Sequence, residues 1–168
     1  MNEIATAAEE SRFWDLIDTA WAHVGPQPDE LRKGLADRQS DDEAFALDPH
    51  LPEFLARLRA LTEQLSGAEL TALDRVAERK LHDIDRADIQ EVTDGSDDGF
   101  LYCRGFILAM GRDFYRAVSA DPAVAVTDAE CERFCYFFAH LHNERFGCFP
   151  ETGSGISRES GANRAGWS

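Results

Sequence analysis

Lysine, cysteine and long apolar runs are scarce in this chain of 168 residues. Only Lys33 and Lys80 are lysines, so arginine supplies nearly all of the basic side chains. Four scattered cysteines are too few for a disulfide-held scaffold, which indicates a reducing, cytoplasmic setting. No apolar run approaches the roughly 20 residues of a membrane span, and the start of the chain lacks the features of a signal peptide. We therefore expect a cytoplasmic protein without membrane attachment.

Negative charge dominates the composition. The chain has 32 acidic residues against 17 basic ones, for a formal net charge of −15. Residues 1–99 carry 24 of these acids and 10 bases, whereas residues 100–168 are nearly balanced. Since a strongly acidic protein repels phosphate, we expect no direct binding of nucleic acid. Hydrophobic residues make up 43% of the chain, which is enough for a folded core.

Apolar residues recur at spacings of three and four along most of the chain, and this period predicts helices. Three pairs have the spacing of a capping box, in which each side chain bonds the backbone of the other residue: Thr6 with Glu9, Ser66 with Glu69, and Thr127 with Glu130. Ser96 is a good N-cap for a further helix. These signals place four helix starts.

The same spacing predicts one helix over residues 96–121 and a last helix over residues 127–146. Residues 151–168 are rich in Gly, Ser, Arg and Asn and have no period, so we expect a disordered C-terminal tail. The sequence therefore predicts an all-α protein, with a compact single-domain bundle of about five or six helices in residues 1–150 and no substantial sheet.

Residues 94–101 resemble the beginning of a calcium loop. Oxygen-bearing side chains alternate from Asp94 to Asp98, and Gly99 occupies the sixth position. The twelfth position needs a bidentate Glu, but Gly105 stands there, within a predicted helix. We expect a capped helix start at this place and no metal.

Arg104 is the most informative charged residue, because it lies between Phe100 and Ile107 on the apolar face of a predicted helix. A guanidinium keeps its charge and is costly to bury alone, so we expect a carboxylate partner. A ligand-binding role for Arg104 is the alternative. The candidate partners are Asp15, Asp18, Asp97 and Asp98.

The thiols near the C-terminal end of the chain invite comparison with a zinc site. Cys131 and Cys135 are one helical turn apart, and His142 and Cys148 follow. His142 would lie about 10 Å along the helix axis from Cys135, too far to share a tetrahedral ion with both cysteines. We expect buried, reduced thiols and no metal or other cofactor.

Two stretches of the chain resemble a known family. One runs over residues 13–18 (FWDLID), and the other begins at residue 96 with SDDGF and continues through Tyr102, Arg104-Gly105, Ile107, Gly111-Arg112 and Phe114-Tyr115 to Asp121-Pro122. This pattern is similar to a family of small acidic bacterial proteins, frequent in actinobacteria, that is described only as a domain of unknown function. The resemblance covers roughly residues 12–150 and implies an all-helical domain with no established activity.

The acidic run over residues 83–98 leads to a functional hypothesis. We expect a non-enzymatic interaction or regulatory protein that binds a basic protein partner, with an immunity, adaptor or nucleic-acid-mimic role as variants of this idea. The alternative is a small enzyme or a metal- or ligand-binding protein that uses the carboxylates at 94–98 with Arg104. A third possibility is that the acids only form a solubilising face. The candidate binding residues are Asp83, Asp85, Asp94, Asp97, Asp98 and Arg104.

Overall fold

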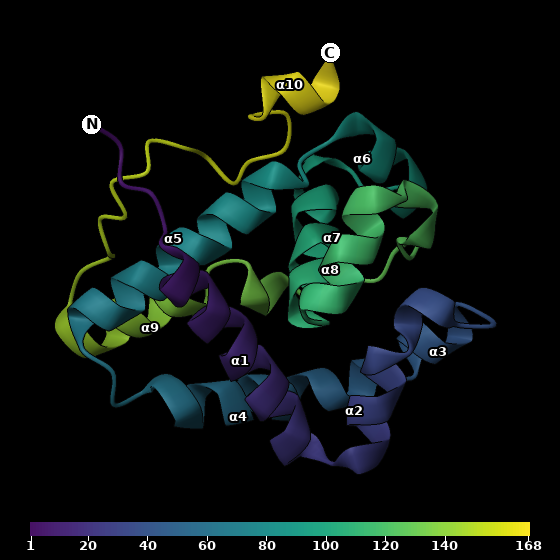
Figure 1. Ribbon diagram of the computed structural model, residues 1–168, viewed down its shortest axis with the longest axis horizontal. Coiled ribbons are helices and arrows are strands. Elements are labelled where there is room, and N and C mark those ends of the chain that lie inside the picture. Colours follow the sequence, from purple (N-terminus) through teal and green to yellow (C-terminus); the bar gives the residue numbers. More distant parts are fainter.

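The computed structural model describes residues 1–168 as helices and connecting segments, with no strand (Figure 1). The longer helices are α1 (Ala7–Val24), α2 (Pro26–Lys33), α4 (Leu51–Thr62), α5 (Gly67–Asp83), α7 (Asp97–Ala109), α8 (Arg112–Ala120) and α9 (Phe137–Phe146). The shorter helices are α3 (Asp42–Phe45), α6 (Ala87–Thr93) and α10 (Arg164–Trp167), and the 3₁₀ turns are η1 (Leu35–Asp37), η2 (Asp48–His50), η3 (Pro122–Val124) and η4 (Glu132–Phe134). The all-α class is confirmed, but five or six helices is an undercount.

Local capping chemistry fixes the starts of α1 and α5. Thr6 accepts a hydrogen bond from the Glu9 backbone while the Glu9 side chain accepts one from the Thr6 backbone, and Ser66 and Glu69 repeat this arrangement. Ser96 accepts a bond from the Gly99 backbone at the start of α7. These three of the four predicted helix starts are confirmed.

The helix expected over residues 96–121 is divided in two at Gly111. The φ angle of Gly111 is 104°, a backbone conformation that L side chains rarely adopt. A Cβ atom at this position would lie 2.6 Å from Nη1 of Arg32, a side chain that packs here from α2. The chain therefore turns sharply between α7 and α8. The spacing of apolar residues is the same on both sides of the turn, so the sequence pattern predicts one continuous helix.

The last helix begins at Phe137, ten residues later than predicted. The Thr127 hydroxyl donates to the Val92 carbonyl at the end of α6 (2.9 Å) instead of capping a helix, and Asp128 has a φ of 62°. The Cys131 backbone N–H donates to the Tyr102 carbonyl (3.0 Å). Residues 125–136 thus form an irregular segment that is bonded to α6 and α7, and these long-range bonds replace the expected helix.

The core lies where α1 crosses α4 and α5, with α7 and α9 packed on α5. Trp21 stacks on Phe54 with ring centroids 4.6 Å apart, and its Nε1 donates to the Ala109 carbonyl (2.7 Å). Gly105 permits the close approach of η4 to α7, because a Cβ atom there would lie 2.6 Å from the Cys135 sulfur. None of the helices combines the length and the hydrophobicity that a membrane crossing requires.

Residues 151–168, for which the sequence predicts disorder, follow an extended path along α5 and end in α10 beside α6 (Figure 1). Ser154 and Arg158 are buried in this segment. At its beginning, the Glu3 backbone N–H donates to the Gly153 carbonyl (2.8 Å). Polar side chains of α5 bind the segment along its path, and a search for apolar periodicity does not detect contacts of this kind.

Candidate functional site

Seven exposed carboxylates gather on neighbouring segments, and none has a Lys or Arg partner within salt-bridge distance. They come from the end of α6, the first turn of α7, the irregular segment before η4 and the first residue of η4. We call this surface the acidic patch, and its members are Glu91, Asp94, Asp97, Asp98, Asp128, Glu130 and Glu132. It contains three of the predicted site residues, Asp94, Asp97 and Asp98.

Backbone contacts hold the segments of the acidic patch together. The Asp128 N–H donates to the Thr93 carbonyl (3.1 Å), and the Thr127 hydroxyl donates to the Val92 carbonyl. Asp94 adopts a left-handed conformation at the end of α6, with a φ of 58°. A short polar residue such as Asp tolerates this conformation better than most side chains do. The turn brings the end of α6 directly onto the start of α7.

The charge of the patch affects neighbouring titratable groups. The Glu132 carboxylate raises the pKa of Tyr102, with smaller contributions from desolvation and from Asp98. Burial raises the pKa of the Cys103 thiol to about 12, and Glu130 and Asp128 act in the same direction. Negative charge from the start of α7 and from residues 128–132 therefore acts on the neighbouring residues Tyr102 and Cys103 of α7.

A cleft of about 620 Å³ borders the patch, between α4, α7, η4 and α9. Asp98 and Glu132 belong to both the patch and the cleft lining. Tyr102, Tyr136 and Phe137 supply aromatic surface within it. Aromatic faces beside carboxylates attract cations, through the ring quadrupole and through charge. Arg59 and Arg133 also line the cleft, so its lining carries charge of both signs, and Asp98 and Glu132 join the cleft to the patch.

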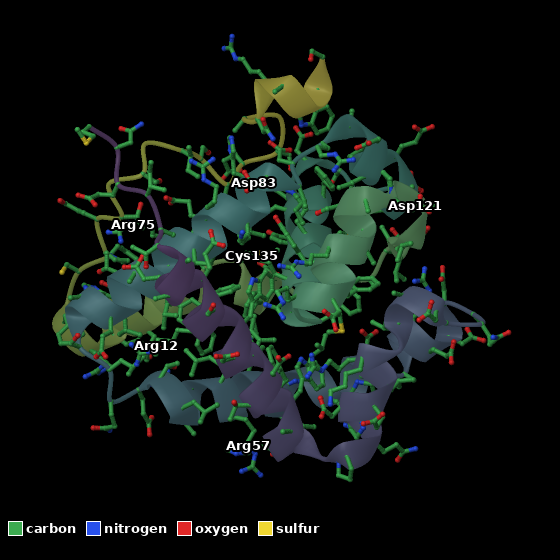
Figure 2. All side chains as sticks on the ribbon, in the orientation of Figure 1. Arg12, Arg57, Arg75, Asp83, Asp121 and Cys135 are labelled. Carbon is green, nitrogen blue, oxygen red and sulfur yellow. The ribbon has the colours of Figure 1, made fainter.

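The other two predicted aspartates lie away from the patch. Asp83 is exposed at the C-terminal end of α5, where Figure 2 labels it, and its carboxylate lies 3.5 Å from Arg79. Asp85 is fully buried. Its two oxygens accept bonds from the backbone of Gly161 and Asn163 and from the Trp167 indole, at 2.9 to 3.0 Å. The acidic run of the sequence is thus divided between an exposed surface and an internal contact with the C-terminal segment.

Arg104 is completely buried, as the sequence predicts, but the expected carboxylate partner is wrong. Its guanidinium donates to the Leu81 carbonyl (2.8 Å) and to the Ser160 hydroxyl (3.1 Å), and its centre lies 4.7 Å from the centroid of the Phe100 ring. Burial lowers the pKa of Arg104, and Asp85 opposes this effect.

None of the four proposed partners forms an ion pair with Arg104. Asp97 contributes only its backbone carbonyl, which accepts a bond from the Ser160 hydroxyl (2.5 Å). Asp18 lies elsewhere, 2.8 Å from Arg32. A helical wheel shows that Arg104 faces inward, but it gives no information on the carbonyl and hydroxyl groups that other segments bring to it.

The thiols of Cys131 and Cys135 are free and buried, as expected, and Figure 2 labels Cys135 in the interior of the molecule. Burial raises the pKa of Cys131 to about 11 and that of Cys135 to about 12. His142 contacts the Cys148 carbonyl (2.6 Å) through Nδ1. No three side chains of His, Cys, Asp or Glu form a group with the geometry of a metal site, and this includes the calcium-like segment at 94–98.

Sequence reasoning missed two further buried arginines, Arg32, which is paired with Asp18 and Asp29, and Arg158. Arg158 and Asp74 form an ion pair at 2.6 Å, and only 4% of either side chain is exposed. The one available signal was Asp74 itself, a carboxylate between Leu73 and Val76 on a strongly amphipathic helix. Its partner lies 84 residues away in a segment without period, so its position could not be found from local spacing.

Comparison with known proteins adds a family to this description. No curated protein and no solved structure matches the chain. A family model covers residues 8–144, a span that includes the acidic patch, the cleft and Arg104 but ends before the C-terminal segment. The chain therefore belongs to the family described as Protein of unknown function (DUF4240).

Proposed function

We propose that the protein is a non-enzymatic interaction module that binds a basic protein partner through the acidic patch and the adjoining cleft. The observation that supports this best is the gathering of seven carboxylates on neighbouring segments with no cation of the chain within salt-bridge distance. Some carboxylates elsewhere on the surface have Arg or Lys partners, as in the pairs of Arg12 with Glu69 and Arg57 with Glu53, and others, such as Asp37 and Asp113, have none. The seven patch carboxylates have none, so their charge is available to a partner.

The second observation is the fixed shape of the surface. Bonds from Thr127 and Asp128 to the end of α6 hold the patch segments in place. A preorganised surface loses little conformational entropy on binding, which favours recognition over general solubilisation. The free thiols in the interior agree with the cytoplasmic setting that we include in the proposal.

The enzymatic alternative has less support. It requires Arg104 to act together with the carboxylates at 94–98. Arg104 has no exposed surface, and the residue that links it to Asp97 is Ser160, through a backbone carbonyl. The patch side chains are exposed and do not converge on Arg104. A binding role therefore fits the geometry better than catalysis.

The test compares two variants of equal charge. Asp97→Asn, Asp98→Asn and Glu132→Gln together remove three charges from the patch. Asp37→Asn, Asp42→Asn and Asp113→Asn remove three exposed, unpaired charges from η1, α3 and α8. The immobilised wild type and both variants are incubated with a native lysate at low and high salt, and retained proteins are identified by mass spectrometry.

We expect a basic protein that is retained at low salt by the wild type and the control variant, released at high salt, and lost from the patch variant. If the patch variant and the control variant retain the basic protein equally, the position of the removed charges does not matter. This result would refute binding at the acidic patch.

A further inference from the structure

A row of polar side chains on α5 and at its C-terminal end binds the extended C-terminal segment. Glu78 accepts bonds from the Thr152 and Ser154 hydroxyls, and Asp85 accepts the three bonds described above. His82 contacts the Ser157 carbonyl through Nδ1 (3.1 Å). We call this surface the α5 groove, and its members are Asp74, Glu78, His82 and Asp85. Most of its bonds run to backbone atoms or short hydroxyls, a pattern suited to an extended peptide.

Arg158 is buried in the α5 groove, with 4% of its side chain exposed. Its guanidinium lies 2.6 Å from the Asp74 carboxylate and 3.5 Å from that of Glu78, and it donates to the Cys135 carbonyl at 2.6 Å. The Tyr136 ring lies beneath it, with its centroid 4.7 Å from the guanidinium carbon. Two carboxylates, a carbonyl and an aromatic face form a nearly complete recognition set for a planar guanidinium.

Asp74 and Glu78 form a pocket for the Arg158 guanidinium, and the C-terminal segment supplies this cation. Asp74 and Glu78 are one helical turn apart, and their side chains are only 4% and 13% exposed. Arg158 is the sole Lys or Arg within salt-bridge distance of either. Burial raises the pKa of Asp74, and Arg158 opposes that rise. Since buried, unpaired carboxylates are costly, the pocket selects strongly for a cationic side chain.

The segment that now fills the pocket is held mainly by polar contacts. Four of the eight residues from 151 to 158 are exposed, and Ile156 is the only large apolar side chain among them. A cavity of about 460 Å³ remains beside the Arg158 guanidinium, between Asp74, Tyr136 and Phe149. Opening of this segment exposes little apolar surface, so its main cost is the loss of the Arg158 ion pair, which a competing arginine replaces. The family match contains the α5 groove and ends at residue 144, before its occupant.

We propose that the α5 groove is a binding site for an arginine side chain on an extended peptide of the basic partner, and that residues 151–168 occupy it as an internal competitor. This inference rests on the proposed function, to which it adds the identity of the recognised side chain. Arginine is favoured over lysine because its planar fork reaches both carboxylates and stacks on Tyr136 at the same time.

The probe is a fluorescein-labelled peptide with the sequence of residues 150–163, together with versions that carry Lys or Ala in place of the arginine. Binding to the full chain is measured by fluorescence anisotropy. Arg158→Ala vacates the pocket, while Arg164→Ala removes the same charge from an exposed side chain of the same segment that makes no side-chain bond. The double variant Asp74→Asn with Arg158→Ala vacates the pocket and also removes its principal carboxylate.

We expect Arg158→Ala to bind the arginine peptide at least tenfold more tightly than the wild type or Arg164→Ala does. Arg158→Ala should bind the lysine and alanine peptides more weakly than it binds the arginine peptide. The double variant should lose this preference. A folded Arg158→Ala protein that does not distinguish the arginine peptide from the alanine peptide would overturn the proposal.

If Arg158→Ala does not fold, hydrogen exchange of the wild-type protein tests whether the arginine peptide displaces the C-terminal segment. An excess of the arginine peptide should raise the exchange rates of the Gly161 and Asn163 amides at least tenfold, because both donate to Asp85 only while the segment is docked. Unchanged rates would refute competition for the groove. The patch variant should bind the peptides as the wild type does. If the patch variant and the control variant retain proteins from the lysate equally while the peptides still bind, only the proposed function is refuted.

Discussion

Two of the three buried arginines, Arg104 and Arg158, show how differently one residue type can be accommodated. Arg158 is neutralised by Asp74, whereas Arg104 relies on a carbonyl, a hydroxyl and an aromatic face, and its Nε has no partner. The sequence identifies Arg104 as buried because its helical neighbours are apolar. It cannot identify Arg158, whose neighbours in the chain are Ser157 and Glu159. Residue-scale prediction therefore succeeds only where the local period carries the information.

Replacement of each arginine by methionine should separate the two cases. Arg158→Met leaves Asp74 buried without its cation, and we expect a loss of about 3–5 kcal/mol in the free energy of unfolding. Arg104→Met breaks no ion pair, and although it removes a positive charge near Asp85, that carboxylate keeps its three hydrogen bonds, so we expect a loss of about 1–3 kcal/mol. Urea unfolding at pH 7 measures both values. A loss for Arg104→Met that equals or exceeds that for Arg158→Met would contradict this assignment of roles.

Asp74 should also give the protein a specific pH dependence. Burial raises its pKa in the folded protein above the ordinary value of about 3.9, so the folded state binds the proton more tightly than the unfolded state does. The resulting stabilisation is fully present below pH 3.9 and is lost as the pH rises through the folded pKa. The stability of the wild type relative to Asp74→Asn should therefore fall over this interval. Unfolding of both proteins between pH 3 and pH 7 tests this, and a constant difference would contradict it.

At the scale of elements, the success of prediction depends on whether the signal is local. The Thr6 and Ser66 capping boxes are complete within four residues each and were found. Thr127 has the same spacing to Glu130, but its hydroxyl bonds Val92 instead. A contact with α6 thus outweighs a local preference. The division between α7 and α8 was missed for a similar reason, because the apolar pattern on both sides of Gly111 has a common period.

The turn at Gly111 can be tested against a second glycine. Gly111→Ala should destabilise the protein through its positive φ and through the contact with Arg32. Gly147 also has a positive φ, of 77°, but a Cβ atom there has no neighbour within 4 Å. We expect Gly147→Ala to cost about 1–2 kcal/mol from backbone strain alone and Gly111→Ala to cost clearly more. Thermal melts compare the two, and equal losses would show that the Arg32 contact is easily relieved.

At the scale of the whole molecule, negative charge is distributed unevenly after folding as well as along the sequence. The sequence predicts an acidic face over residues 83–98, and the fold retains part of it, buries Asp85 and adds Asp128, Glu130 and Glu132. These three lie more than 25 residues further along the chain. Their contribution depends on how residues 125–136 return to α6 and α7, which local patterns do not encode. The candidate site was therefore predictable in its charge and only partly in its membership.

Crowded like charges make the folded protein sensitive to salt. We expect the melting temperature to rise as NaCl is increased from about 10 to 300 mM, because the ions screen repulsion over a Debye length that shortens to below about 10 Å. The variant with Asp97→Asn, Asp98→Asn and Glu132→Gln should respond less than the control with Asp37→Asn, Asp42→Asn and Asp113→Asn. Differential scanning calorimetry measures the shifts. A fall in melting temperature with salt in the wild type would contradict net repulsion.

The contact between Trp167 and Asp85 gives the protein a built-in optical reporter. Trp14 and Trp21 are buried in the core, whereas Trp167 is 37% exposed and lies edge-on to Phe100 with ring centroids 6.0 Å apart. Acrylamide in the surrounding water will therefore quench the emission of Trp167 far more than that of the other two indoles. Release of the C-terminal segment would expose this ring fully and shift its emission to longer wavelength. The occupancy of the α5 groove can thus be followed in the unlabelled protein by steady-state fluorescence.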